Sequence, residues 1–446
     1  MSDRFKTPPI IYTILFLAVL VFSVYKGFYA YRWIKPIADK DPGNIANSIF
    51  VMPSICTHNT GIFLTICYSN EKLMPIEDIG AGDLGYPLLA NIITFLRLKD
   101  SPLSKEDLVK VNIWINWFGL LFLAVALIMA KLKWSALPII VAGTHYFMQE
   151  QELSADYYST FWGIFCLTLG GIIYLCMSFN KKNHSSNRFI YLLVSVLIFM
   201  MSLLMREPFG YIGIITSFFV MFIYFIKEKS NFKSKSLKYI YVSLMLLSIT
   251  LAPSALLTLR NMIWNVPKGK VIARHGFSYS LVMDLGSLQN PWGLTRIDST
   301  MINMEKNIDP NVVHYSNEHF KILRTLYIKM LFDKPREILD IYYAMLLNIL
   351  NSSNFCKITI FGNYLKILFG MVILIFISLK ARFNDNFFML LALSIGCLLA
   401  LSQGIFAAGT YYSKTAEIGF IAIILISVEM LFLNLKNWRF LHVTKG

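Results

Sequence analysis

Long apolar runs dominate the pattern of hydrophobic and polar positions along the chain. Continuous runs of about 20 apolar residues can cross a bilayer as helices, and they lack the alternation of barrel strands. We therefore predict about ten membrane-spanning helices, at roughly 9–30, 111–130, 134–148, 157–178, 189–205, 208–226, 239–258, 359–379, 387–407 and 415–434. The run at 9–30 is too long for a cleaved signal peptide and lacks a small-residue cleavage site, so we expect a retained signal-anchor helix.

Composition supports this assignment. Hydrophobic residues make up 56% of the 446 residues and charged residues only 15%, against about 25% charged residues in an average soluble domain. The sequence thus predicts an all-α polytopic membrane protein.

The net charge of +15 orients the chain and does not indicate nucleic-acid binding. With the N-terminus inside, most of the Lys and Arg excess falls in short inner segments such as "KLK", "KKNHSSNR" and "KEKSNFKSKSLK". That is the distribution that the positive-inside rule predicts. Both termini are then expected in the cytoplasm.

This topology divides the chain into three regions: an N-terminal transmembrane module at 1–258, an outer loop region at 259–358 and C-terminal helices at 359–446. The first region includes a large outer segment, 31–110. The inner loops are short and carry no GxxxxGK[ST] phosphate-binding loop, so we do not expect an ATP-driven transporter in this chain. Cys56 and Cys67 both fall in the outer segment and could pair in an oxidising compartment, although their spacing alone does not establish a bridge.

Charged residues gather at the outer ends of the predicted spans. The first outer segment contains "EDIGAGDLGYP", with Glu77, Asp78, Asp83 and Tyr86. Later outer turns add further acids and cations: Glu150, Glu152, Asp156, Arg206, Glu207, Arg260, Lys268, Lys270, Arg274 and His275. Taken singly, the acids and the two lysines are more typical of solvated surface charge, His275 is more typical of a structural histidine, and Arg206 could pair with its neighbour Glu207. Lys366 and Glu429 are exceptions, because they fall inside predicted spans, where a charge is costly.

Four of these segments together resemble motifs of the polytopic glycosyltransferases of the GT-C fold class. They are the acidic motif "EDIGAGDLGYP" (77–87), the span-opening motif "ELSADYYSTFWGIF" (152–165), the arginine turn "REPFG" (206–210) and the loop motif "LRNMIWNVPKGKVIARHG" (259–276). The resemblance is strongest to the branch of protein O-mannosyltransferases and the aminoarabinose transferase of lipid A. It covers most of 1–300, and beyond that only the hydropathy agrees.

The resemblance implies a polyprenyl-phosphate sugar as donor and an inverting single displacement. It implies Asp83 as general base, with Asp78 as alternate because the first-loop acids are split, and Asp156 as a residue that orients the acceptor. The remaining assignments are Arg260, Arg274, His275 and Arg206 for the donor phosphate, Glu77, Tyr86 and Glu152 as acceptor or accessory residues, and Asp83 with Asp156 for a divalent metal, which relatives do not all require. The arginine turn lacks the Thr-Lys of some members.

The acceptor stays open between a glycan, a lipid and a protein. No long cytoplasmic tail or retention signal points to a eukaryotic organelle, so we expect a bacterial inner membrane with the active site facing the periplasm. Two other functions compete. A polysaccharide polymerase or ligase of the O-antigen type would use loop Arg and His residues rather than a first-loop acid. A secondary transporter or flippase would place charges along a midplane path.

Overall fold

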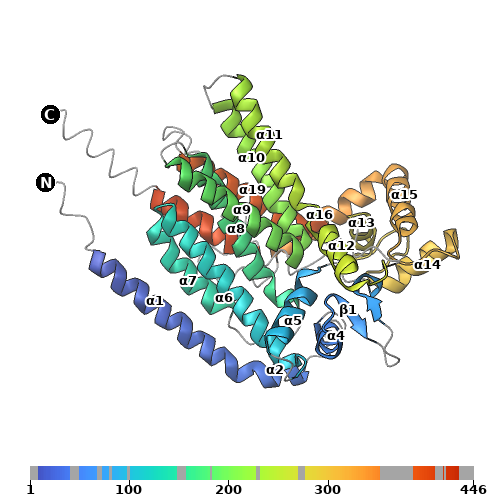
Figure 1. The fold of residues 1–446 in the computed structure, drawn as a ribbon. Coiled ribbons are helices and arrows are strands. Elements are labelled where there is room, and N and C mark those ends of the chain that lie inside the picture. Colours follow the sequence, from blue (N-terminus) through green and yellow to red (C-terminus); the bar gives the residue numbers. More distant parts are fainter. Residues whose placement is uncertain are drawn as a thin grey trace.

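The computed structural model describes residues 9–40, 50–67, 73–79, 83–97, 101–147, 157–180, 183–227, 232–269, 277–351, 385–406, 415 and 418–430. Its core is a bundle of apolar helices, shown in Figure 1. The bundle helices are α1 (Pro9–Ala30), α6 (Lys105–Met129), α7 (Lys133–Phe147), α8 (Phe161–Phe179), α9 (Ser185–Met205), α10 (Glu207–Lys227), α11 (Phe232–Ile249), α12 (Ala252–Trp264) and α19 (Asp385–Phe406). A further apolar helix covers Ile418–Met430.

Helix α8 lies at the centre of the bundle, and α1 lies at its edge. Every residue of α8 is buried, against α6, α9, α10 and α19. Helix α1 packs mainly on α7 and leaves most of its apolar side chains exposed, as expected of a helix that faces lipid (Figure 1).

Five described helices are long and apolar enough to cross a membrane, or six if one bent pair forms a single span. They match the predicted spans at 9–30, 111–130, 157–178, 189–205 and 208–226. The span predicted at 134–148 corresponds to the shorter α7, and the one at 359–379 lies outside the described residues. A multi-pass membrane protein is confirmed, and the count of about ten spans stays a prediction.

The span predicted at 239–258 is not one straight helix. Its two halves, Tyr239–Ile249 and Ala252–Trp264, meet at an angle of 54°. Pro253 sits in the first turn of α12, where its missing N–H needs no partner, whereas inside a continuous helix it would break the hydrogen-bond ladder.

Glu429, which falls inside a predicted span, has hydrogen-bond partners within the protein. Its carboxylate accepts hydrogen bonds from the backbone N–H groups of Trp134 (3.2 Å) and Ser135 (2.7 Å) and from the Ser135 hydroxyl (2.6 Å). These groups belong to the first turn of α7, where the helix dipole favours a negative charge. Glu429 therefore ties the helix Ile418–Met430 to the start of α7.

The segments predicted to lie outside gather at one end of the bundle (Figure 1). The first comprises η1 (Tyr31–Trp33), α2 (Ile34–Lys40), α4 (Met52–Thr60), β1 (Thr65–Cys67), β2 (Leu73–Pro75), η3 (Ile76–Ile79) and α5 (Gly85–Leu96), and η5 (Tyr157–Thr160) precedes α8. The second comprises α13 (Phe277–Leu285), α14 (Asp298–Ile308), α15 (Asn317–Asp333) and α16 (Pro335–Asn351), which enclose a small apolar core of their own.

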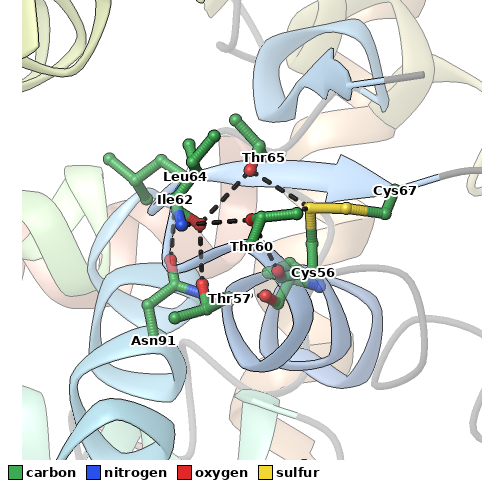
Figure 2. Close-up of a disulfide and its surroundings, with 9 residues drawn as sticks. Cys56, Thr57, Thr60, Ile62, Leu64, Thr65, Cys67 and Asn91 are labelled. Carbon is green, nitrogen blue, oxygen red and sulfur yellow. Dashed lines mark hydrogen bonds between the residues drawn. A yellow bond between two sulfur atoms is a disulfide. The ribbon is translucent and has the colours of Figure 1, made fainter. Parts of the chain in front are cut away.

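A disulfide and an asparagine fasten the first outer segment. Strands β1 and β2 pair antiparallel, with Thr65 opposite Pro75. Cys56 of α4 is bonded to Cys67 of β1, as Figure 2 shows. Asn91 of α5 accepts from the N–H of Leu64 (2.8 Å) and donates to the carbonyl of Pro53 (3.0 Å), so α4, α5 and β1 form one unit.

Candidate active site

The acidic motif and the arginine turn meet through an ion pair. Asp83 lies just before α5, and Arg206 lies between α9 and α10, where an extended backbone ends α9. The guanidinium of Arg206 donates from Nη1 to Oδ2 of Asp83, and the backbone N–H of Glu207 donates to Oδ1 (3.3 Å). Asp83 therefore sits at the N-terminus of α10, where helix N–H groups and the helix dipole stabilise an anion. Its side chain is almost buried.

The span-opening motif reaches the same place. The hydroxyls of Tyr86 and Thr160 are hydrogen-bonded to each other, and both residues are fully buried. The guanidinium carbon of Arg206 lies 4.9 Å from the ring centre of Phe161, a cation–π contact. The span-opening motif thus contacts the acidic motif at Tyr86 and the arginine turn at Arg206.

A second ion pair joins the acidic motif to the loop motif. Arg260 and Glu77 are 1% and 5% exposed, and the two side chains form a two-pronged pair, with Nη2 donating to Oε1 at 2.8 Å and Nη1 donating to Oε2. Arg260 also donates to the carbonyl of Leu64 (3.0 Å) and to the side chain of Asn261 (2.9 Å from Nε). All three guanidinium nitrogens are therefore engaged.

The backbone of the loop motif also lies against the acidic motif. A Cβ added to Gly269 would come within 2.9 Å of the Cβ of Glu77 and 3.1 Å of Oδ1 of Asp78. Glycine allows this close approach because it has no side chain. The loop motif thus contacts the acidic motif at two places, Arg260 and Gly269.

Several predicted site residues lie outside the described residues, and their roles stay predictions: Glu152, Asp156, Arg274 and His275. The same holds for Glu150, Lys270 and Lys366. The proposed metal at Asp83 and Asp156 stays a prediction too. Both oxygens of Asp83 already accept hydrogen bonds, one of them from a cation.

The sequence predicted that the charged residues of the four motifs lie on one side of the membrane, but it did not predict which of them form ion pairs. Arg206 was assigned to the donor phosphate, with pairing to neighbouring Glu207 as the alternative, and the structure pairs it with Asp83, 123 residues away. Arg260 was assigned to the donor phosphate, and the structure places it on Glu77. Thr160 was not singled out, although it directly follows the conspicuous "ADYYS" run.

No family model matches the sequence, and no curated protein matches it either. Two solved structures are similar in fold. One is the archaeal oligosaccharyltransferase AglB from Archaeoglobus fulgidus in complex with an inhibitory peptide and a dolichol-phosphate, with 13% identity, a TM-score of 0.46, and coverage of 95% of this chain and 52% of that one. The other is ArnT from Cupriavidus metallidurans in the apo state, with 13% identity, a TM-score of 0.36, and coverage of 94% and 77%.

The chain thus spans about half the length of AglB. At these TM-scores the likeness concerns the arrangement of helices only, and the residues of this chain carry the functional proposal.

Proposed function

We propose that this chain is an inverting membrane glycosyltransferase that moves a sugar from a polyprenyl-phosphate donor to an acceptor hydroxyl at the outer face of the membrane. One observation carries the proposal. Four motifs that resemble those of such enzymes, spread along the chain, contact one another: two ion pairs, Asp83 with Arg206 and Glu77 with Arg260, join three of them, and the span-opening motif contacts Tyr86 and Arg206. Motifs that matched by chance would have no reason to meet in space.

Asp83 is the general base of the proposed reaction. The acceptor oxygen forms a bond to the anomeric carbon while the bond from that carbon to the phosphate oxygen breaks. The electron pair of the broken bond leaves with polyprenyl phosphate, and the acceptor proton passes to the carboxylate of Asp83. A single displacement of this kind inverts the anomeric configuration. Asp78, which is half-buried beside Gly269, is the alternate base.

The two arginines act as positioning residues in this proposal. Arg206 and the N–H of Glu207 hold the Asp83 carboxylate at the start of α10. Arg260 holds Glu77 of the same acidic motif. Arg274 and His275, which follow Gly269 in the loop motif, are then the proposed ligands of the donor phosphate, because cationic and imidazole N–H groups bind phosphate oxygens.

The disulfide supports an outer location for this site. Cys56 and Cys67 are bonded, and such bridges persist in oxidising compartments such as the bacterial periplasm and not in the cytosol. The same unit holds Leu64, to which Arg260 is bonded. We therefore propose the periplasmic face of a bacterial inner membrane, with a glycan, lipid or protein as acceptor.

The test measures release of polyprenyl phosphate, a readout that does not depend on knowing the acceptor. The chain is purified in detergent and incubated with a panel of polyprenyl-phosphate sugars and membrane extract, and the released lipid phosphate is quantified by mass spectrometry. We expect Asp83→Asn to lower kcat by about 10²–10⁴-fold, the usual contribution of general base catalysis, with little change in KM for the donor.

Exposed Glu318, in the second outer segment, supplies the control: Glu318→Gln should keep full activity. Asp78→Asn should lower activity much less than Asp83→Asn. The proposal is wrong if no donor yields polyprenyl phosphate, or if Asp83→Asn and Asp78→Asn both retain the activity of the unaltered chain.

A further inference from the structure

A second cluster of polar side chains lies in the second outer segment, apart from the proposed active site. Glu305 comes from α14, His319 from α15, and His314 from the turn between them. Each offers one potential ligand atom, and these three atoms all lie within 4.8 Å of one another. Glu305 and His319 are 1% and 0% exposed.

The distances in the cluster bracket those around a bound metal ion. Oε2 of Glu305 lies 2.7 Å from Nδ1 of His319 and 3.6 Å from Nδ1 of His314. An ion bound tetrahedrally at about 2.0–2.1 Å separates its ligand atoms by roughly 3.3 Å. Both distances to Oε2 of Glu305 therefore lie within about 0.6 Å of that separation.

Some polar atoms of the cluster have no hydrogen-bond partner within the described part of the protein. Among the described residues, Oε1 of Glu305, Nε2 of His319 and Nδ1 of His314 have no hydrogen-bond partner. Buried polar atoms usually have partners, so Oε1 of Glu305 and Nδ1 of His314 are available for a ligand or a water molecule.

The local fold holds the three residues in place. The Ser316 hydroxyl caps α15 by accepting from the N–H of His319 (3.2 Å), which fixes the first turn of that helix. Tyr315 adopts a left-handed backbone, with φ of 63°, which only a few per cent of residues other than glycine do. The rings of Tyr279 and Tyr315 pack around both histidines.

We propose that Glu305, His314 and His319 bind one divalent metal ion of the zinc type, which fastens the turn at 309–316 between α14 and α15. Two imidazole nitrogens and one carboxylate oxygen are a ligand set that zinc accepts, with water in the fourth position. His314 is 24% exposed at its side chain, which gives the ion a path from solvent. This proposal stands independently of the proposed glycosyl transfer.

The decisive variant is His314→Phe. It keeps an aromatic ring beside Tyr315 and Tyr279 and removes both ring nitrogens of His314. If the cluster is merely a hydrogen-bonded pair of Glu305 with His319, this change leaves zinc binding unaltered, because His314 lies 3.6 Å from the carboxylate, beyond hydrogen-bond distance. If the cluster binds metal, the change removes a ligand.

The full chain in detergent is stripped with a chelator and titrated with zinc alone, while bound zinc per chain and the melting temperature are measured. We expect the unaltered chain and the Glu318→Gln control to bind one more zinc ion per chain than His314→Phe, and to melt at a higher temperature when zinc is added. Affinity at this site should fall by at least about 100-fold in His314→Phe, more than the loss from removing a mere supporting residue.

Glu305→Gln provides a second measurement with the same expected loss of one zinc ion. The difference in bound zinc per chain between the unaltered chain and these variants reports this site alone, because a metal ion near Asp83 would bind equally to all of them. Equal zinc binding by the unaltered chain and His314→Phe would overturn the proposal, as would an unaltered chain that binds no zinc and melts at the same temperature with and without chelator.

Discussion

The buried pair of Arg260 and Glu77 offers the sharpest test of how the outer segments are held together. Replacing Arg260 by Met leaves the Glu77 carboxylate, only 5% exposed, without its cation. Removing one partner of a buried ion pair typically costs about 3–5 kcal/mol of stability. Replacing both residues, as in E77L/R260M, removes both buried charges and is expected to come within about 1 kcal/mol of the unaltered chain.

A double-mutant cycle measures this coupling. Melting temperatures of the four chains are compared in one detergent, with binding of a thiol-reactive dye to buried Cys166 and Cys397 as a second readout of unfolding. The exposed pair of Arg336 and Asp340, with side chains 92% and 73% exposed and 3.9 Å apart, serves as the matched control. Its disruption should change stability by at most about 0.5 kcal/mol, because water screens exposed pairs.

The buried pair contributes no coupling if R260M and E77L each lose no more stability than disruption of the exposed control pair. The same holds if the double variant loses as much stability as the two single variants together. The same double variant also decides the role of Arg260 in catalysis. A positioning role predicts that E77L/R260M is stable but has a lowered kcat and an unchanged KM for the donor, because the contacts of Arg260 with Glu77 and with the carbonyl of Leu64 are both lost. A role in binding the donor phosphate predicts a stable chain with a raised KM for the donor.

Three further perturbations probe the fold. Replacing Cys56 and Cys67 by Ser should lower the free energy of unfolding by about 2–3 kcal/mol, as expected for a disulfide that closes a short loop. A reducing agent should lower the melting temperature of the unaltered chain by a similar amount. Gly119→Ala should destabilise by about 1–3 kcal/mol or more, because its Cβ would lie 2.0 Å from a carbonyl oxygen of α8, whereas Gly27→Ala, with open space around it, should not. Glu429→Gln should lower the melting temperature by the equivalent of about 1–2 kcal/mol without affecting transfer, since a charge leaves the start of α7.

The long helices of the bundle were predictable because their signal is local. Helices α8, α9 and α10 begin and end within a few residues of the predicted spans, since an apolar run of sufficient length fixes a spanning helix by itself. The break between α11 and α12 was missed although Pro253 marks it. Hydropathy averages over a window and does not register a proline that ends one helix and begins another.

The pairing of charges was not predictable in the same way. Sequence order placed Asp83, Arg206 and Arg260 on one side of the membrane, but which cation meets which acid depends on how distant helices pack. The metal cluster was missed for a different reason. Glu305, His314 and His319 fall in a segment where the resemblance to known motifs no longer extends. The signal that could have revealed it is the local spacing of one acid and two histidines around a short turn.

Leu64 shows why stability and catalysis should be linked in this protein. Its backbone adopts a left-handed conformation, with φ of 57°, which costs roughly 1–2 kcal/mol for such a residue. Asn91 of α5 accepts from its N–H, and Arg260 of α12 donates to its carbonyl (Figure 2 shows the first of these). One strained residue, next to the disulfide-bonded strand, is thus held by the helix that follows Asp83 and by the arginine that holds Glu77. Loosening either contact should release the segment that positions Asp83, so variants here are expected to lose activity before they lose the fold of the bundle.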